Sequence, residues 1–192
     1  MNNQSTLLTP ILRSDLQESL NRSHIDPAVL STFQRILLTT DGTVTDMLEA
    51  YLCEQIQLVK LSEKLVHTNH YIQPMELKEG SEIFERKILL RGRISRKNYL
   101  YAESVVVLDR LEDSFRNELI NTKTPIGKLW FEKRVETFKE IIDSGKSPAQ
   151  ELSHYFNIEP EANLFSRTYC VLSNKKYTMM ITEKFPESYF RK

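Results

Sequence analysis

The central strand of the expected fold is Ile83-Phe84-Glu85-Arg86-Lys87-Ile88-Leu89-Leu90. Because side chains along a strand alternate between its two faces, one face carries Phe84, Arg86, Ile88 and Leu90. That face is apolar except for one guanidinium, and an unpaired buried charge costs several kcal/mol. The sequence therefore predicts that Arg86 either pairs with an internal carboxylate, as part of the architecture, or binds an anionic ligand in a cavity.

The composition is that of an ordinary globular protein and disfavours two classes of partner. The 192 residues are 40% apolar and 27% charged, which suits a single α+β domain over 1–192. Because 26 basic and 26 acidic side chains cancel, no net charge draws the chain to nucleic acid or anionic lipid. No apolar run approaches the roughly 18 residues that span a membrane, and Met1–Ser5 lacks the basic start of a signal peptide, so a cytoplasmic location is expected. Neither Cys53 nor Cys170 belongs to a CxxC pair, which argues against a disulfide framework.

The first 54 residues predict three helices that cover the sheet. Apolar residues recur at helical spacing over 10–22 and 27–38, and Thr43 with an acid three residues on resembles a capping box for a third helix. Two helices around a turn could also form a DNA-binding helix-turn-helix. Phosphate contacts need cations, yet residues 23–54 contain one Lys or Arg against five acidic side chains. The helical cover is therefore the preferred interpretation.

Alternation and turn residues predict strands at 55–66, 82–94, 99–109, 163–174 and 177–185. Residues 134–143 are ambiguous between helix and strand, and the resemblance given below favours a strand there, the fourth of six. Short connections between several neighbours favour a mainly antiparallel sheet. Gly145-Lys146-Ser147-Pro148 is expected to interrupt the chain after the fourth strand, and 110–123 is interpreted as irregular with some helix.

The last strand carries a second charge on an apolar face. The residues that share this face are Tyr177, Met179, Ile181, Glu183 and Phe185. Glu183 could form a buried ion pair with Arg86, or the two could face each other across a ligand cavity. Two charged residues on apolar faces favour a site.

A short helix is predicted to begin at Thr124 and Pro125, with Thr124 as the N-cap and Pro125 as the first helical residue. The free backbone N–H groups of such a start attract a carboxylate or phosphate, although capping by Thr124 would satisfy part of them. His67 and His70 have the spacing of metal ligands, but no carboxylate or thiol nearby completes a site. No phosphate-binding glycine motif is present, so neither a metal nor a cofactor is expected.

Three motifs, taken in order, resemble those of chorismate lyases. They are Arg86-Lys87-Ile88-Leu89-Leu90, Lys123-Thr124-Pro125-Ile126-Gly127-Lys128-Leu129-Trp130-Phe131 and Ile181-Thr182-Glu183-Lys184-Phe185. The run Phe33-Gln34-Arg35-Ile36-Leu37-Leu38-Thr39-Thr40-Asp41-Gly42-Thr43 is similar to the divergent archaeal and cyanobacterial branch of that superfamily. The resemblance covers about residues 28–187. It implies an enzyme that removes pyruvate from chorismate to give 4-hydroxybenzoate, a precursor of ubiquinone or plastoquinone.

The resemblance also implies a fold and a set of partners. The fold is a six-stranded antiparallel sheet, here within 55–187, with helices on one side. Helical flaps, here 1–54 and a second one near 110–131, cover a buried ligand cavity. The elimination needs no cofactor, and the expected partners are chorismate and 4-hydroxybenzoate, with no nucleic acid and no insertion into a membrane.

The residues that match the family's site are four. Arg86 would bind a substrate carboxylate and Glu183 would contact the ring hydroxyl, as the two catalytic residues. The backbone amides of Val44 and Ile126 would bind carboxylate oxygens, and both positions lie at expected helix starts. One arginine and two helix starts suit a substrate with two carboxylates.

The chain departs from the best-known lyases at Glu103, which stands where they carry an arginine after the second strand. Two alternatives therefore stay open. One is a lyase that acts on a modified chorismate, and the other is a non-catalytic small-molecule sensor, because the same fold serves as the effector domain of some transcription regulators.

Overall fold

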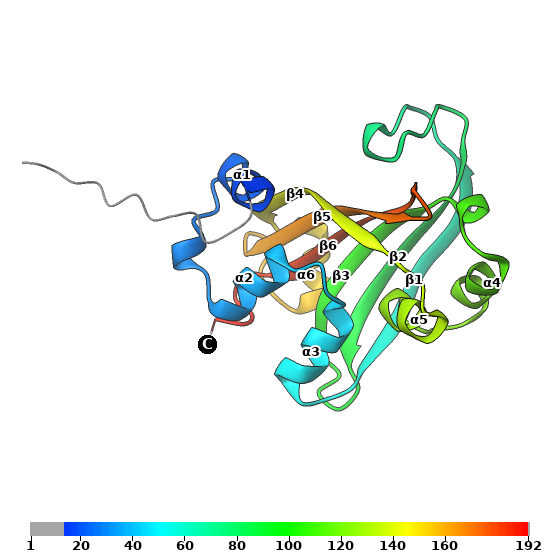
Figure 1. Ribbon diagram of the computed structural model, residues 1–192. Helices are drawn as coiled ribbons and strands as arrows, with labels where there is room; N and C mark the ends of the chain where they lie inside the picture. Colours follow the sequence, from blue (N-terminus) through cyan, green and yellow to red (C-terminus); the bar gives the residue numbers. More distant parts are fainter. Residues whose placement is uncertain (1–13, 192) are drawn as a thin grey trace, which may run out of the picture.

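The computed structural model describes residues 14–191, which form one six-stranded antiparallel sheet with helices packed on it (Figure 1). The strands are β1 (Ile56–His67), β2 (Glu82–Gly92), β3 (Asn98–Val106), β4 (Phe138–Pro148), β5 (Asn163–Ser173) and β6 (Lys176–Pro186). Their order across the sheet is β1-β2-β3-β6-β5-β4, so two three-stranded meanders join through their last strands. The predicted α+β class and the six antiparallel strands are confirmed.

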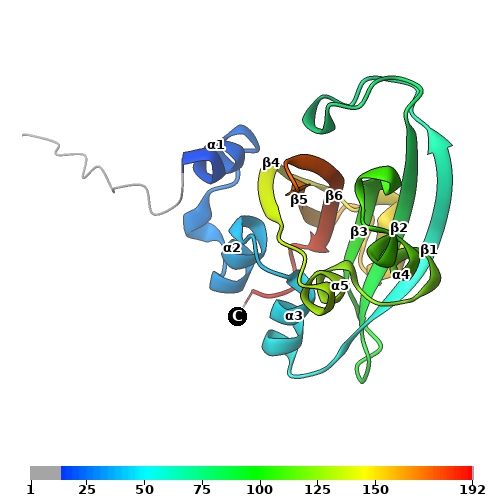
Figure 2. The same cartoon turned by 45° about the vertical axis from the view of Figure 1, so that its right-hand side comes forward.

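Most helices cover one face of the sheet, which we call the helical face. They are α1 (Ser14–Arg22), α2 (Thr32–Thr39), α3 (Val44–Leu52), α4 (Asp113–Asn121) and α5 (Ile126–Lys133). Figure 2 shows them packed against the curved sheet. Their apolar faces meet the row of β2 that holds Phe84 and Leu90 in one large core. Because α2 and α3 bury Leu38 and Leu48 completely in this core, they act as cover, as the sequence favoured.

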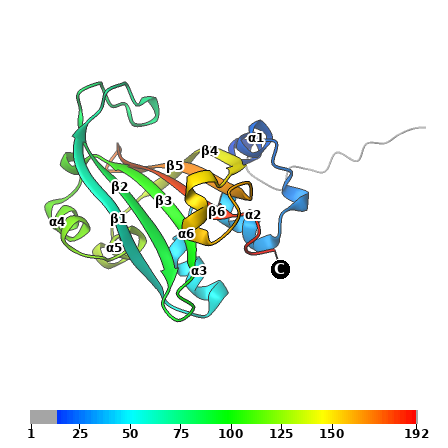
Figure 3. The same ribbon diagram turned by 180° about the vertical axis from the view of Figure 1, so that it is seen from behind.

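The opposite face of the sheet is covered by short segments. Helix α6 (Ser153–Phe156) packs its Phe156 against Leu89 and Tyr101, which alternate with the residues of the helical face. The connection between β1 and β2 folds back over Ile83 and buries Met75 completely. Figure 3 shows α6 on this side, seen from behind. This face of the sheet is therefore covered only in part, because Glu85 and Lys87 in the middle of β2 are exposed.

Several expected boundaries differ from the structure. The strand expected over 99–109 ends at Val106, the one expected over 134–143 begins at Phe138, and the helix expected over 27–38 is divided into a short 3-10 helix (Pro27–Val29) and α2.

Residues 145–148 do not interrupt the chain but continue β4 to its end, in register with β5. Strand β4 lies at the edge of the sheet, where a terminal Pro148 costs no ladder hydrogen bond. Gly145 suits a close approach, because a Cβ there would lie 2.7 Å from Oγ of Ser166. The expected helix over 10–22 begins at Ser14 in the described residues, and 10–13 lie outside them.

The N-terminal capping box forms at a different helix from the one expected. At α2, Oγ of Ser31 accepts a hydrogen bond from the backbone N–H of Gln34, whose side chain accepts one from the Ser31 N–H. At α3, Thr43 is the N-cap residue, as expected, but its side chain makes no capping hydrogen bond. The first backbone N–H groups of α3 therefore receive no hydrogen-bond acceptor from the N-cap side chain.

Among residues 14–191, no helix is long and apolar enough to cross a lipid bilayer. Cys53 and Cys170 are both free thiols, one exposed and one buried.

We expect Ser31→Ala to lower the free energy of unfolding by about 1–2 kcal/mol, because the replacement removes the N-cap of α2. Urea denaturation followed by circular dichroism measures the change. Thr43→Val is the matched control, since the hydroxyl it removes caps nothing, and it should shift the free energy by less than about 0.5 kcal/mol. A larger loss at Thr43 than at Ser31 would contradict the placement of the capping box.

Candidate active site

A cavity of about 60 Å³ lies between the helical face of the sheet and the first residues of α3 and α5. Apolar side chains from β1, β2, β3 and β6 form its floor, namely Leu58, Ile88, Leu90, Leu100, Ala102 and Ile181. Its polar side chains include Arg86, Lys139, Tyr169 and Glu183. A mostly apolar cavity with a few convergent polar groups is the usual form of a small-molecule site.

The four site residues expected from the sequence all line this one cavity. Arg86 projects from β2 and Glu183 from β6, and Val44 and Ile126 are the first residues of α3 and α5. They come from four elements that are far apart in the sequence. The structure thus brings the whole expected set together.

The N-termini of α3 and α5 meet at the cavity with uncapped amides. Helix α5 begins at Ile126 with Pro125 as its N-cap, one residue later than expected, and a proline side chain accepts no hydrogen bond. The expected N-cap, Thr124, instead donates its own N–H to Oγ1 of Thr122. Gly127 allows the two helix starts to touch, because a Cβ there would lie 2.2 Å from Cγ2 of Thr43.

Arg86 has both an internal partner and a free nitrogen. Its side chain is 1% exposed, and its Nε lies 2.9 Å from Oε1 of Glu63 on β1. A β-bulge between Lys60 and Ser62 changes the alternation of β1, so that Glu63 stands opposite Arg86. Nη2 of Arg86 is buried and has no hydrogen-bond partner among residues 14–191. Burial lowers the pKa of Arg86, and the Glu63 carboxylate opposes that shift.

The Glu63 carboxylate has a second cationic partner besides Arg86. Its second oxygen lies 2.9 Å from Nζ of Lys60, so the carboxylate is shared between two cations. This group of two cations and one carboxylate therefore carries a net positive charge, which favours binding of an anion at Nη2 of Arg86.

Glu183 pairs with a different arginine from the one the sequence offered. Its Oε2 lies 2.7 Å from Nε of Arg167, the residue directly across from it on β5, and its Oε1 accepts a hydrogen bond of 3.0 Å from Tyr169. An ion pair between Arg86 and Glu183 does not form, because each has its own partner on the neighbouring strand. Burial and the Glu183 carboxylate hold the pKa of the Tyr169 hydroxyl well above its ordinary value.

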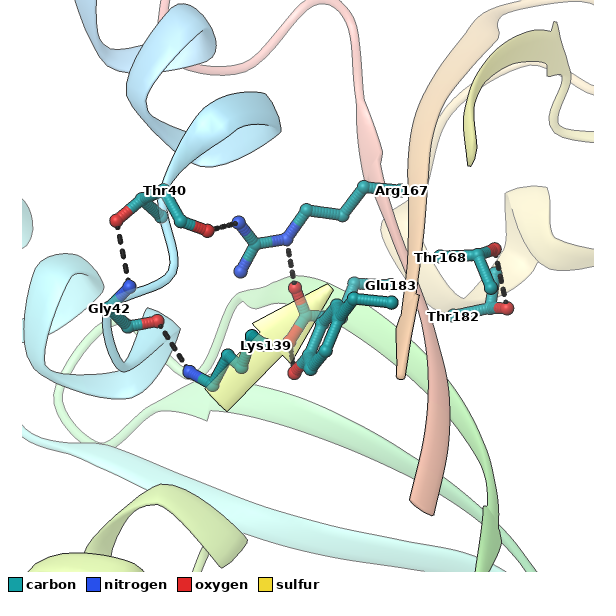
Figure 4. Close-up of polar contacts among 8 residues, drawn as sticks. Thr40, Gly42, Lys139, Arg167, Thr168, Thr182 and Glu183 are labelled. Atoms are coloured by element: carbon teal, nitrogen blue, oxygen red, sulfur yellow. Dashed lines mark hydrogen bonds and ion pairs between the residues drawn. The ribbon is translucent and has the colours of Figure 1, made fainter. Parts of the chain in front are cut away.

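Arg167 is a second buried guanidinium with a free nitrogen. It is 1% exposed, and its Nη1 donates to the backbone oxygen of Thr40 at 2.6 Å (Figure 4). Its buried Nη2 has no hydrogen-bond partner in the part of the chain that the structure describes. The sequence analysis missed Arg167, although it alternates with Phe165 and Tyr169 in the same way that Arg86 alternates with apolar residues.

Lys139 was also missed, and it lines the same cavity from β4. Its side chain is buried, and its Nζ donates to the backbone oxygen of Gly42 at 3.0 Å. The ammonium lies 5.1 Å from the centre of the Trp130 ring and 5.6 Å from that of Tyr169. Burial lowers the pKa of Lys139 to about 8, against the raising effect of Glu183. Its strand was ambiguous between helix and strand in the sequence, so no alternation pointed to it.

Glu103 lies outside the cavity. It faces away from the helical face, where it accepts a hydrogen bond of 2.6 Å from the Tyr101 hydroxyl and lies 3.8 Å from Nζ of Lys87. The residue of β3 that lines the cavity at this level is its neighbour, Ser104. Within residues 14–191, no group of three or more His, Cys, Asp or Glu could hold a metal ion, and His67 and His70 join none.

The sequence of this chain matches those of one known protein family. A family model described as chorismate pyruvate-lyase Rv2949c-like matches residues 38–191. A chorismate pyruvate-lyase of Mycobacterium tuberculosis is 30% identical over 165 residues, which cover 82% of this chain and 81% of that protein. The chorismate pyruvate-lyase of Mycobacterium leprae is 30% identical over 159 residues, which cover 82% of this chain and 75% of that protein.

A solved structure shares the fold at much lower identity. The effector domain of PhnF from Mycobacterium smegmatis superimposes with a TM-score of 0.58 at 9% identity, over 76% of this chain and 88% of that one. At this identity the likeness concerns the fold alone.

We expect Glu183→Leu to lower the free energy of unfolding by roughly 3–5 kcal/mol, because it leaves the Arg167 charge buried without its carboxylate. The double variant Arg167→Met, Glu183→Leu should recover most of that loss, since no charge then remains in the pair. Urea denaturation of both variants tests the coupling. A double variant less stable than the single one would show that Arg167 is held by contacts other than this pair.

Proposed function

Because the chain belongs to the chorismate pyruvate-lyase Rv2949c-like family, we propose that it is a chorismate pyruvate-lyase. The reaction cleaves chorismate into pyruvate and 4-hydroxybenzoate, and we expect the latter to enter quinone synthesis. The observation that carries the proposal is the buried Nη2 of Arg86, a guanidinium donor without a partner at an apolar cavity. Such a donor is costly unless a ligand accepts its hydrogen bond.

The proposed chemistry is an elimination that balances without a co-reactant. The ether bond between the ring and the enolpyruvyl group breaks, and its electron pair goes to the departing oxygen. The neighbouring ring carbon, which carries the hydroxyl, loses its hydrogen as a proton. That proton is taken up by the methylene carbon of the leaving group, which becomes the methyl group of pyruvate. The ring becomes aromatic, so the protein has to orient the substrate more than to activate it.

Arg86 would hold the ring carboxylate through its free Nη2. The uncapped amides at Val44 and Ile126 would add hydrogen bonds to the same anion, since helix N-termini favour negative charge. Keeping Arg86 paired with Glu63 fixes its direction before the substrate arrives.

Glu183 would accept the hydrogen bond of the ring hydroxyl. Each of its oxygens already accepts one hydrogen bond, from Arg167 or from Tyr169, and a carboxylate oxygen can accept a second one. These two contacts fix the carboxylate in place. It can therefore orient the hydroxyl-bearing carbon, whose hydrogen has to leave.

We expect Arg86→Ala to lower kcat/KM for chorismate by about thirtyfold to several thousandfold, the equivalent of roughly 2–5 kcal/mol for an unpaired buried carboxylate. The assay mixes the purified protein with chorismate and measures pyruvate and 4-hydroxybenzoate in parallel. Equal amounts of both products are expected from the wild-type protein. The fold should tolerate the change, because Glu63 keeps Lys60 as a partner.

Arg91→Ala is the matched control on the same strand. Its Nε pairs with Asn98 and it does not line the cavity, so activity should change less than threefold. Near-full activity of Arg86→Ala would remove Arg86 from the proposed site.

A second candidate function is binding without turnover, which the fold shared with the PhnF effector domain favours. Saturable binding of chorismate or 4-hydroxybenzoate without release of pyruvate would support this sensor function. Turnover of a ring-modified chorismate in preference to chorismate would instead support a lyase with a different substrate.

A further inference from the structure

We propose that Lys139 binds the second carboxylate of the substrate, the one on the enolpyruvyl group, so that the cavity takes a dicarboxylate with one anion at each end. The inference rests on the proposed function and assigns a subsite within the same cavity. It makes Lys139 the residue that distinguishes the doubly charged substrate from the singly charged aromatic product.

The Lys139 ammonium has hydrogen-bond donors that are not used within the described part of the protein. It is 7% exposed and lines the cavity, and its one hydrogen bond within residues 14–191 goes to the backbone oxygen of Gly42. An ammonium has three donors, so two are free. Among residues 14–191, no carboxylate forms an ion pair with Lys139. A buried cation without a counterion is costly, and an anionic ligand removes that cost.

The second argument is the charge around Lys139. Arg167 approaches the same Tyr169 ring, with its Cζ 5.2 Å from the ring centre, and its buried Nη2 also has no partner. Figure 4 shows Arg167, Glu183 and Lys139 gathered beside the loop that holds Thr40 and Gly42. Two cations, Arg167 and Lys139, thus lie near one buried carboxylate, Glu183, which among residues 14–191 forms an ion pair with Arg167 and not with Lys139.

The third argument is position. Arg86 lies on β2 and Lys139 on β4, with β3, β6 and β5 between them, and Glu183 projects from β6. In chorismate the hydroxyl is opposite the ring carboxylate and next to the ether. If Arg86 holds the ring carboxylate and Glu183 the hydroxyl, the enolpyruvyl group therefore lies at the Glu183 end, where Lys139 is.

The experiment compares Lys139→Met and Lys139→Arg with the wild-type protein. For Lys139→Met we expect kcat/KM for chorismate to fall about 10- to 150-fold, mainly through KM, as for the loss of one charged hydrogen bond. The inhibition constant of 4-hydroxybenzoate should change less than threefold, because this product lacks the second carboxylate. Lys139→Arg should restore most of the chorismate affinity.

Lys146→Met is the matched control, the same replacement on the same strand. Its Nζ pairs with Glu187 outside the cavity, so both ligands should bind as in the wild-type protein. A purely structural role for Lys139 would give a different pattern. Lys139→Met would then lower Tm and weaken chorismate and 4-hydroxybenzoate alike, which would overturn the inference. We expect Tm to stay or rise, because an apolar side chain replaces an unpaired buried charge.

The pH profile provides an independent readout. The groups that face Lys139 are Glu183, Arg167 and Tyr169 from the sheet, and Asp41 and Asp46 from the start of α3. Burial lowers the pKa of Lys139 to about 8, so the free protein should lose affinity for chorismate as pH rises through about 8 and the ammonium loses its proton. In Lys139→Arg this loss should be absent, since arginine stays charged. If Lys139→Arg lost affinity for chorismate over the same pH range as the wild-type protein, the assignment would be overturned.

Failure of the proposed function would be recognised separately. A wild-type protein that releases no pyruvate contradicts the lyase, and calorimetry with chorismate and 4-hydroxybenzoate then tests Lys139 alone. Weaker binding of chorismate to Lys139→Met, with 4-hydroxybenzoate unaffected, would support the subsite. Equal binding of chorismate by the two proteins, or none by the wild-type protein, would overturn it.

Discussion

The burial of charge on one apolar face of the sheet is the constraint from which the site follows. Arg86 and Arg167 are both about 1% exposed, and each has a carboxylate on the neighbouring strand, Glu63 or Glu183. Each carboxylate fixes one nitrogen and leaves Nη2 without a partner. If every nitrogen of the two guanidinium groups were paired, neither would offer a hydrogen bond to a ligand. The incomplete pair of Arg86, which lines an apolar cavity, leaves a directed donor that an anionic ligand can use.

The sheet supplies these partners through its register. Arg167 and Glu183 face each other because β5 and β6 pair antiparallel, whereas Glu63 reaches Arg86 only because a bulge changes the alternation of β1. The two meanders join at β3 and β6, which places one pair in each meander. The cavity therefore lies over the junction of the two meanders, with a positive group on either side and the starts of α3 and α5 above it.

The sequence predicted the architecture and two of the five charged side chains discussed above, and the reason for each omission is physical. Arg86 and Glu183 were found because each interrupts an apolar row in a strand with clear alternation, and Arg167 carried the same signal without being recognised. Glu63 could not be found, because the bulge that aims it is a property of the strand pairing. Lys139 lies on an edge strand whose alternation is weak. The capping box at Ser31 rather than Thr43 depended on which hydroxyl faced a free N–H, which composition does not specify.

The charged groups of the cavity suggest why one fold can occur in both lyases and effector domains. The cavity is lined by a cation from β2 and one from β4, the carboxylate of Glu183 and two uncapped helix starts, and each of these groups is suited to hold a polar group of a ligand rather than to break a bond. For a substrate that becomes aromatic as it fragments, orientation of that kind is a large part of what catalysis requires. A site built to hold a rigid dicarboxylate is thus already close to a lyase when its ligand is chorismate. With an unreactive anion in the same place, it would be a receptor, and the difference would lie in the ligand more than in the fold.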